Sequence, residues 1–143
     1  MTVDGLDDAA IAAILMQTRR IALVGASANP DRPANEIQGW LQDRGYDVTP
    51  INPGLAGQRL LGRMVVGSLA EAVPLDMVDV FRNPAQVPPV VDEAIRLGAR
   101  VVWMQLGVAH ETAAARARAA GISVVMDRCP LIETRRLGLA TLA

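Results

Sequence analysis

Short apolar runs that alternate with helical segments constrain the fold of this chain more than any other feature. The runs are nearly continuous in Val, Ile, Leu and Met, whereas a strand with one face in water alternates apolar and polar residues. Strands buried on both faces are typical of a parallel sheet with helices on either side, so the pattern predicts a doubly wound α/β fold. The five strongest runs are Ile21–Val24, Tyr46–Ile51, Asp76–Phe81, Arg100–Met104 and Ile122–Met126.

Proline and glycine mark where the helices between these runs begin and end. Pro33 fits the first turn of a helix, and Gly45 fits the position just past its end. Gly98 and Gly121 end two further helices in the same way. The predicted helices are an N-terminal one around Ile11–Leu15, Pro33–Arg44, a one- or two-turn helix with Ser68 and Glu71 as a capping box, Pro89–Leu97, Ala109–Ala120 and Leu131–Leu137.

Two details refine the expected sheet and its limits. Pro50 cannot donate a hydrogen bond to a neighbouring strand, so it is expected near the end of its strand or at the edge of the sheet. Val65 and Val66 are expected to add a very short strand. We expect a single domain over residues 20–143, with residues 1–19 forming an N-terminal helix packed on it.

The composition excludes several kinds of function. The net charge of −1 provides no general electrostatic field for binding DNA, RNA or an acidic membrane. All 14 basic residues are arginine, so the chain has neither a Schiff-base lysine nor the lysine of a Walker-type phosphate loop. Arginine still binds phosphate through two hydrogen bonds at once, so a phosphate ligand held locally remains possible.

The single cysteine and the N-terminal residues indicate where the protein resides. Cys129 cannot form an internal disulfide, and this chain alone cannot assemble a thiolate zinc site, so no metal is expected. The first ten residues are acidic where a signal peptide is basic, and no apolar run reaches the length of a membrane span. We expect a cytoplasmic protein, and the exposed edges of the sheet make a homodimer plausible.

The segment from Ile21 to Pro33, which reads IALVGASANPDRP, has the order of residues that builds a phosphate pocket. After the strand, Gly25, Ala26 and Ser27 let backbone N–H groups approach an anion closely. A helix that begins at Pro33 would direct the positive end of its dipole to the same place. An ordinary turn between a strand and a helix has the same appearance, and the loop alone does not separate the two.

The residues that follow each strand are candidates for ligand binding, because doubly wound sheets bind ligands at the carboxyl ends of their strands. These segments share small residues, prolines and single polar groups. They are Gly25–Pro30, Asn52–Gly54, Phe81–Pro84, Gln105–Gly107 and Asp127–Pro130.

A nicotinamide dinucleotide fits this pattern poorly. The turn GASANP lacks the second and third glycines of the G-x-G-x-x-G fingerprint. The second strand ends in Asn52 and Pro53, where a carboxylate would bind the ribose hydroxyls, and Asp47 lies near the beginning of that strand.

Several motifs in one order resemble the stand-alone coenzyme A (CoA)-binding domain proteins, which are similar to the N-terminal domain of succinyl-CoA synthetase alpha subunits. The resemblance covers roughly Arg20 to Leu137 and implies a Rossmann-like, three-layer α/β/α domain that binds CoA. The motifs are GASANPDRP, INPGLAGQRLLGRMVVGSL, VDVFRNPAQVPPVVDEA, VVWMQLGV and VVMDRCP.

The same resemblance implies a role for each candidate residue. Core packing is the alternative for Phe81, and a surface ion pair with Asp79 or Glu93 is the alternative for Arg82. The implied roles are the pyrophosphate for Gly25, Ala26, Ser27 and Asn29, added charge for Arg32, the border of the nucleotide for Pro53 and Gly54, the adenine or pantetheine path for Phe81, Arg82 and Pro84, and deeper positions for Gln105 and Gly107.

The chain also departs from the synthetase pattern. Leu55 stands where the alpha subunits have a lysine, so phosphate binding would depend on Arg32, Arg59 or Arg63. The phosphorylated histidine of the synthetase belongs to a second domain that has no counterpart here. His110, at the start of an alanine-rich helix, is expected to have a surface or capping role.

No set of base, nucleophile and oxyanion donors is visible in the sequence, so we expect a protein that binds CoA or acyl-CoA without chemistry of its own. Two alternatives stay open: a CoA-binding subunit of an acyl-CoA ligase or transferase, and a sensor that binds NAD(P) or ATP.

Cys129 follows the last strand, so it is either a small side chain packed under Pro130 or a thiol that faces the end of pantetheine and forms a mixed disulfide with CoA.

Overall fold

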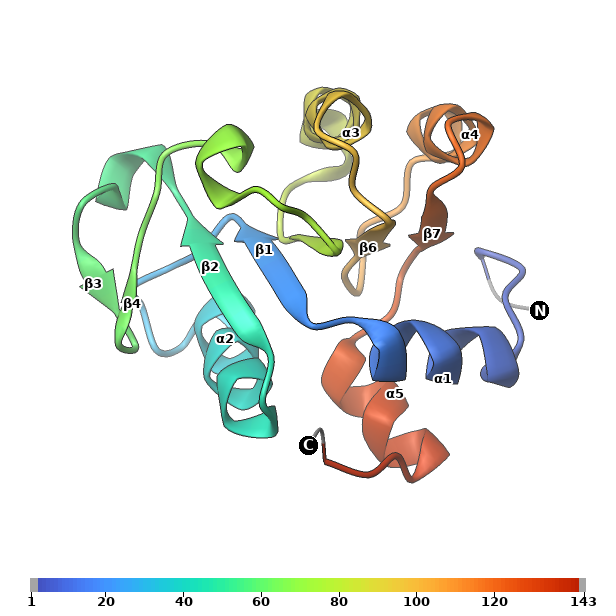
Figure 1. Cartoon of the computed structure of the whole chain (residues 1–143), viewed down its shortest axis with the longest axis horizontal. Coiled ribbons are helices and arrows are strands. Elements are labelled where there is room, and N and C mark those ends of the chain that lie inside the picture. The colour runs from blue at the N-terminus through green and yellow to red at the C-terminus, as the bar shows by residue number, and fades with distance from the viewer. Residues whose placement is uncertain (1–2, 142–143) are drawn as a thin grey trace.

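A five-stranded parallel sheet forms the centre of the protein (Figure 1). The computed structural model describes residues 3–141, so the expected domain limits at residues 1 and 143 lie outside the described part. The strand order is β2-β1-β5-β6-β7, and every neighbouring pair is parallel. The strands are β1 (Arg20–Val24), β2 (Asp47–Ile51), β5 (Met77–Val80), β6 (Val101–Met104) and β7 (Ser123–Val125).

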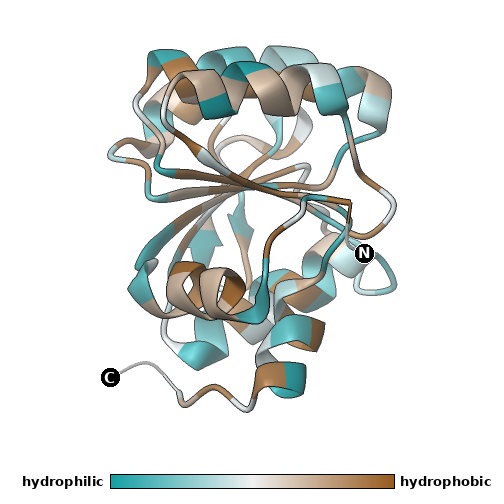
Figure 2. Cartoon of the chain, turned by 90° about the vertical axis from the view of Figure 1, so that its right-hand side faces the viewer, coloured by the Kyte–Doolittle hydropathy of each residue, from teal (hydrophilic) through white to brown (hydrophobic). Residues whose placement is uncertain are grey.

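Helices cover both faces of this sheet, which confirms the doubly wound, three-layer α/β/α prediction (Figure 2). Helices α3 and α4 pack on one face, and α1, α2 and α5 pack on the other. The helices are α1 (Asp8–Gln17), α2 (Pro33–Arg44), α3 (Val87–Arg96), α4 (Glu111–Ala119) and α5 (Pro130–Leu137). Short 3₁₀ turns, η1 (Pro53–Leu55), η2 (Leu69–Ala72) and η3 (Pro84–Gln86), complete the connections.

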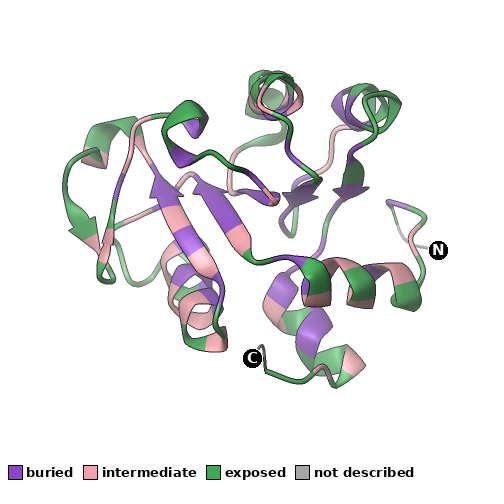
Figure 3. Ribbon diagram, viewed as in Figure 1, coloured by how far each residue is buried: buried purple, intermediate pink, exposed green. Residues whose placement is uncertain are grey.

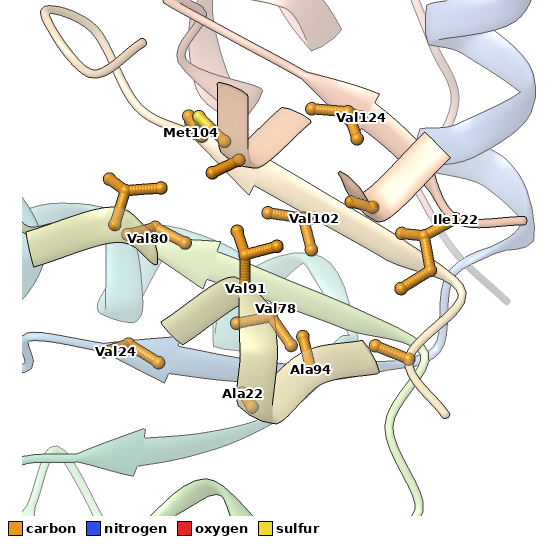
Figure 4. Close-up of a cluster of buried hydrophobic side chains, with 14 of the residues drawn as sticks. Ala22, Val24, Val78, Val80, Val91, Ala94, Val102, Met104, Ile122 and Val124 are labelled. Atoms are coloured by element: carbon orange, nitrogen blue, oxygen red, sulfur yellow. The ribbon is translucent and has the colours of Figure 1, made fainter. Parts of the chain in front are cut away.

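The strands are mostly apolar because successive side chains enter two different cores. Val78 and Val80 of β5 join the core under α3 and α4, where they pack with Val91 and Ala94 of α3 (Figure 4). Met77 of the same strand belongs to the core under α1, α2 and α5. Strands β5 and β6 are buried along their whole length, whereas the outer surfaces of the helices are exposed (Figure 3).

The region after β2 differs from the prediction. Instead of a strand at Val65–Val66, the chain forms a small antiparallel hairpin of β3 (Arg59–Leu60) and β4 (Arg63–Met64). The turn between them places Leu61 and Gly62 at positive φ, the geometry of a two-residue hairpin turn. Val66 makes only an isolated parallel bridge to Ile51. The sequence did not predict the hairpin because each of its strands has only two residues, one charged and one apolar, which is too short for a periodic pattern.

Two other expectations depend on proline. Pro50 lies in β2, which is an edge strand, as predicted. Helix α3 begins at Val87, two residues before the predicted start, and contains Pro88 in its first turn. Proline is tolerated there because the first N–H groups of a helix have no acceptor within it.

A buried ion pair ties the N-terminal segment to the last helix. Both carboxylate oxygens of Asp4 accept hydrogen bonds from the Arg128 guanidinium, each at 2.9 Å, and the two side chains are almost completely buried. Burial works to raise the pKa of Asp4, but the hydrogen bonds from Arg128, Leu6 and Met126 outweigh it and lower that pKa to about 2. Glu133 of α5 pairs with the same guanidinium.

We expect Asp4→Ala to destabilise the fold by at least about 3 kcal/mol, because the change removes a carboxylate partner from the buried Arg128 guanidinium. Urea denaturation measures the difference. Asp8→Ala, which removes an exposed partner of Arg136, is the matched control and is expected to have a much smaller effect. Equal losses for the two variants would contradict this account of the N-terminal segment.

Candidate functional site

A cleft of about 870 Å³ opens at the carboxyl ends of β1, β5 and β6. The order of the strands reverses between β1 and β5: the chain leaves β1 towards β2 on one side, and the later strands extend on the other. Crevices at such a reversal are where doubly wound sheets bind their ligands, and the volume lies within the usual range for small-molecule sites.

The structure brings about half of the predicted site residues to this cleft. Those that line it are Gly25, Ser27, Arg32, Phe81, Arg82, Gln105 and Cys129. The others lie outside its lining: Ala26 is buried beneath the turn, and Asn29, Pro53, Gly54, Pro84 and Gly107 are exposed on the loops around it.

Gly25 is required by the close approach of a neighbouring loop. It has a φ of +92°, and a Cβ atom at this position would lie 2.2 Å from the carbonyl oxygen of Phe81. The N–H of Phe81 in turn donates to Val24 O at 2.9 Å. Glycine therefore lets the loops after β1 and β5 meet at the floor of the cleft.

The turn after β1 offers fewer free N–H groups than its sequence suggests. Gly25 and Ala26 both donate to Ile51 O at 3.1 Å, and the N–H of Asn29 donates to Ser27 Oγ at 3.1 Å. Within residues 3–141, no acceptor is found for the N–H groups of Ser27, Ala28 and Ala34, the last in the first turn of α2. The N–H groups of Ser27 and Ala34, which line the cleft, are therefore available to an anion at this end of it.

Two arginines flank the cleft without ion-pair partners in the described part of the chain. Arg32 is exposed at the N-cap of α2, and Arg82 is half-buried in the loop after β5. The alternative partners considered for Arg82 are engaged elsewhere, Asp79 with Gln105 and Glu93 with Arg96.

Of the three arginines predicted to substitute for the missing lysine, Arg32 lines the cleft, whereas Arg59 and Arg63 are not part of its lining. Arg63 pairs with Asp47, and Arg59 donates to Gly62 O. Phe81 both packs against the core under α2 and lines the cleft, so the two interpretations of this residue are compatible.

Asn52 also lines the cleft, although only its neighbours Pro53 and Gly54 were assigned a role. Its Nδ2 donates to Ala26 O at 2.8 Å, and its Oδ1 accepts from the N–H of Gly54 at 2.8 Å. Asn52 thereby fixes the loops after β1 and β2 to each other. Its position directly after a strand placed Asn52 in a candidate segment, but its contact with Ala26 depends on a second loop that the position does not reveal.

Apolar side chains form a wall of the cleft that the sequence did not indicate. Leu106, in the loop after β6, is 56% exposed, and Ile132 of α5 is 48% exposed. Leu131 and Val108 extend the same wall. Exposed leucine and isoleucine around a concave site are typical of a surface that receives an apolar part of a ligand.

Cys129 lies at the N-cap of α5 and lines the cleft, although it is only 7% exposed. Burial raises the pKa of its thiol, which hydrogen bonds from the backbone of α5 only partly offset. The carboxylates that flank it in sequence have structural partners: Asp127 accepts from the N–H of Gly107, and Glu133 pairs with Arg128 and Arg136.

His110 has the capping role that was expected of it. Its Nδ1 accepts a hydrogen bond from the N–H of Ala113 at 3.1 Å, at the N-terminus of α4.

Asp79 is a fully buried carboxyl group next to the cleft. Its Oδ1 accepts a hydrogen bond from Gln105 Nε2 at 2.7 Å, and no described group donates to its Oδ2. Burial raises its pKa to about 7, and the hydrogen bond from Gln105 offsets this only in part.

We expect Asp79→Asn to be more stable than the wild type at about pH 8, by up to about 4 kcal/mol. Because the pKa of Asp79 rises from 3.8 to about 7 on folding, wild-type stability falls as the pH rises between these values. The advantage of the variant should therefore vanish below about pH 4. Urea denaturation across this range measures it, with Asp31→Asn, an exposed carboxyl, as the control. A difference that does not depend on pH would contradict the prediction.

No helix of residues 3–141 combines the length and apolar character needed to cross a bilayer. The same residues contain no group of three or more histidine, cysteine or acidic side chains arranged to hold a metal ion.

Several known proteins are similar to this chain in sequence and in fold. An uncharacterised Bacillus subtilis protein, YneT, is 39% identical over 122 residues, covering 85% of this chain and 89% of its own length. A hypothetical protein from Pyrococcus horikoshii OT3 is 38% identical with a TM-score of 0.90, covering 97% of each chain. The Thermus thermophilus protein ID.343 is 38% identical with a TM-score of 0.87, covering 92% of this chain and 99% of its own. The CoA-binding domain model matches residues 19–135, and the chain therefore belongs to the CoA-binding domain family.

Proposed function

We propose that the cleft at the carboxyl edge of the sheet binds CoA or acyl-CoA, and that the chain does so without chemistry of its own. One observation carries this proposal: a single cleft joins anion donors at the start of α2 to an apolar wall that ends near Cys129. CoA has the same order of parts, a charged nucleotide diphosphate followed by a long, mostly apolar thiol arm.

The diphosphate is assigned to the end of the cleft near β1. Ser27 and Ala34 supply N–H groups without acceptors in the described chain, and the dipole of α2 favours negative charge at its N-terminus. The Ser27 hydroxyl accepts from the N–H of Asn29, so its own proton remains available to a phosphate oxygen. Arg32 and Arg82 add positive charge at the rim.

The pantetheine arm is assigned to the part of the cleft at the carboxyl ends of β5 and β6. Phe81, Leu106 and Ile132 present apolar surface there, and Gln105 contributes a polar group. Cys129 lies in the same part of the lining, where the thiol end of the arm is expected.

The surroundings of the cleft support binding without catalysis. His110 serves as a helix cap, Asp127 accepts from a backbone N–H, and Glu133 is held in ion pairs. The buried thiol of Cys129 has a raised pKa, which disfavours the thiolate that a nucleophile needs. A role as the CoA-binding subunit of a ligase or transferase would require catalytic groups from another chain.

We expect calorimetry to show heat with CoA and much weaker heat with NAD and with ATP. The protein has no carboxylate at the end of β2 to bind the ribose hydroxyls of NAD, and ATP has no arm to fill the apolar part of the cleft. A response to NAD or ATP with none to CoA would instead favour a nucleotide sensor.

Gly25→Ala tests the location, and it is expected to reduce CoA binding at least tenfold because its Cβ would collide with Phe81 O and separate the two loops. Gly98→Ala introduces a side chain at a similarly positive φ with no atom within 4 Å, so it controls for backbone strain alone. Unchanged CoA binding in the folded Gly25→Ala variant would contradict the location.

Incubation with CoA disulfide is expected to produce one mixed disulfide on Cys129. The Cys129 thiolate attacks one sulfur of the CoA disulfide, forms a new S–S bond to one CoA and releases the other as a thiolate, which takes a proton. Because burial raises the pKa of Cys129, the reaction should be faster at higher pH. Intact mass spectrometry detects the adduct, which should disappear with reductant. An equal adduct on Cys129→Ala, or none on the wild type, would end the hypothesis.

A further inference from the structure

Gln105 is an amide side chain of the cleft that a buried acid holds in place. The residue follows β6 and is only 5% exposed, yet it forms part of the cleft lining. Its Nε2 donates to Asp79 Oδ1 at 2.7 Å. An ionised carboxylate can only accept hydrogen bonds, so it determines which end of the amide faces it.

The other end of this amide is left for the ligand. Within residues 3–141, Gln105 Oε1 accepts no hydrogen bond, and it is not among the fully buried oxygens without a partner. Since Gln105 lines the cleft, this oxygen is open to it. The floor of the cleft therefore presents a hydrogen-bond acceptor at this point, whereas the end near α2 presents N–H donors.

The position along the cleft suggests which part of a ligand meets this acceptor. Gln105 follows β6, two strands away from Gly25 at the end of β1, a separation of about 10 Å at the usual strand spacing. Phosphate oxygens only accept hydrogen bonds, so they do not pair with Gln105 Oε1. The groups of CoA that donate beyond its diphosphate are the hydroxyl, the two amide N–H groups and the thiol of the pantetheine arm.

We propose that Gln105 determines specificity for the pantetheine arm by accepting a hydrogen bond from one of its amide N–H groups, and that Asp79 is the positioning residue that holds Gln105 in this orientation. The inference rests on the proposed binding of CoA in this cleft. Gln105 and Asp79 together would then select for CoA. A nucleotide without an amide-bearing arm leaves Gln105 Oε1 without a hydrogen-bond donor and gains no affinity from it.

The environment of Asp79 makes this orientation depend on pH. Its neighbours in the sheet are Leu23 of β1 and Trp103 of β6, which do not titrate. The titratable groups that α5 and α2 bring towards this part of the cleft are Cys129 and Glu36. Once protonated, the carboxyl group can donate to Gln105 Oε1, and the amide then turns its N–H groups to the cleft. With the pKa of Asp79 near 7, this exchange falls in the neutral range.

Calorimetry of the full chain with CoA at about pH 6 and pH 8 tests the positioning role. Wild-type affinity is expected to be several-fold higher at pH 8, where Asp79 is ionised. In Asp79→Asn the ratio between the two pH values should fall by at least threefold, because the introduced amide does not titrate and cannot enforce one orientation. Titration of the CoA phosphates affects both proteins equally and cancels in this comparison. An unchanged ratio in the variant would overturn the positioning role.

Gln105→Met tests the acceptor itself. It should weaken CoA binding about tenfold while leaving 3′-phospho-ADP, which lacks the pantetheine arm, almost unaffected. Gln58→Met, the same change at an exposed glutamine outside the cleft, is the control and should change neither affinity. Equal losses for CoA and 3′-phospho-ADP would overturn the specificity role. Absence of CoA binding to the wild type at either pH would instead refute the proposed function, and thermal unfolding without ligand verifies that each variant folds.

Discussion

The contact between the backbone of Phe81 and Gly25 is the constraint on which the site depends. It brings the loops after β1 and β5 together at the point where the strand order reverses. A side chain at Gly25 would occupy the space of the Phe81 carbonyl group, so the floor of the cleft exists only because glycine is there. The amides freed for an anion lie further along the turn and on α2, because Ile51 O already occupies those of Gly25 and Ala26.

Two buried acids illustrate how differently one fold treats the same side chain. Asp4 meets a guanidinium and two backbone N–H groups, so its charge is retained and contributes to stability. Asp79 meets only one amide, so burial dominates and its charge is costly near neutral pH. A costly buried group retained beside a cleft is an arrangement typical of a functional site.

The sequence predicted the architecture well because its signals are local and repeated. Apolar runs gave the strands, and Gly45, Gly98 and Gly121 gave the ends of three helices to within about two residues. The hairpin β3–β4 was missed because two residues per strand produce no periodic pattern. At the cleft, the strand-end rule selected Phe81, Gln105 and the segments that contain Asn52 and Leu106. The contacts of Asn52 and the apolar wall that Leu106 forms with Ile132 depend on how distant segments converge, which spacing along the chain does not encode.

The ion pair of Asp4 with Arg128 also links the start of the chain to the wall of the cleft. Arg128 immediately precedes Cys129 and α5, and its backbone carbonyl accepts the indole N–H of Trp103 from the central sheet. Shortened forms of the protein, trimmed ahead of α1 to aid crystallisation, would lack Asp4 and release the loop that carries the thiol. Ligand affinities measured on these shortened proteins would then describe a cleft whose wall is less firmly held than in the full chain.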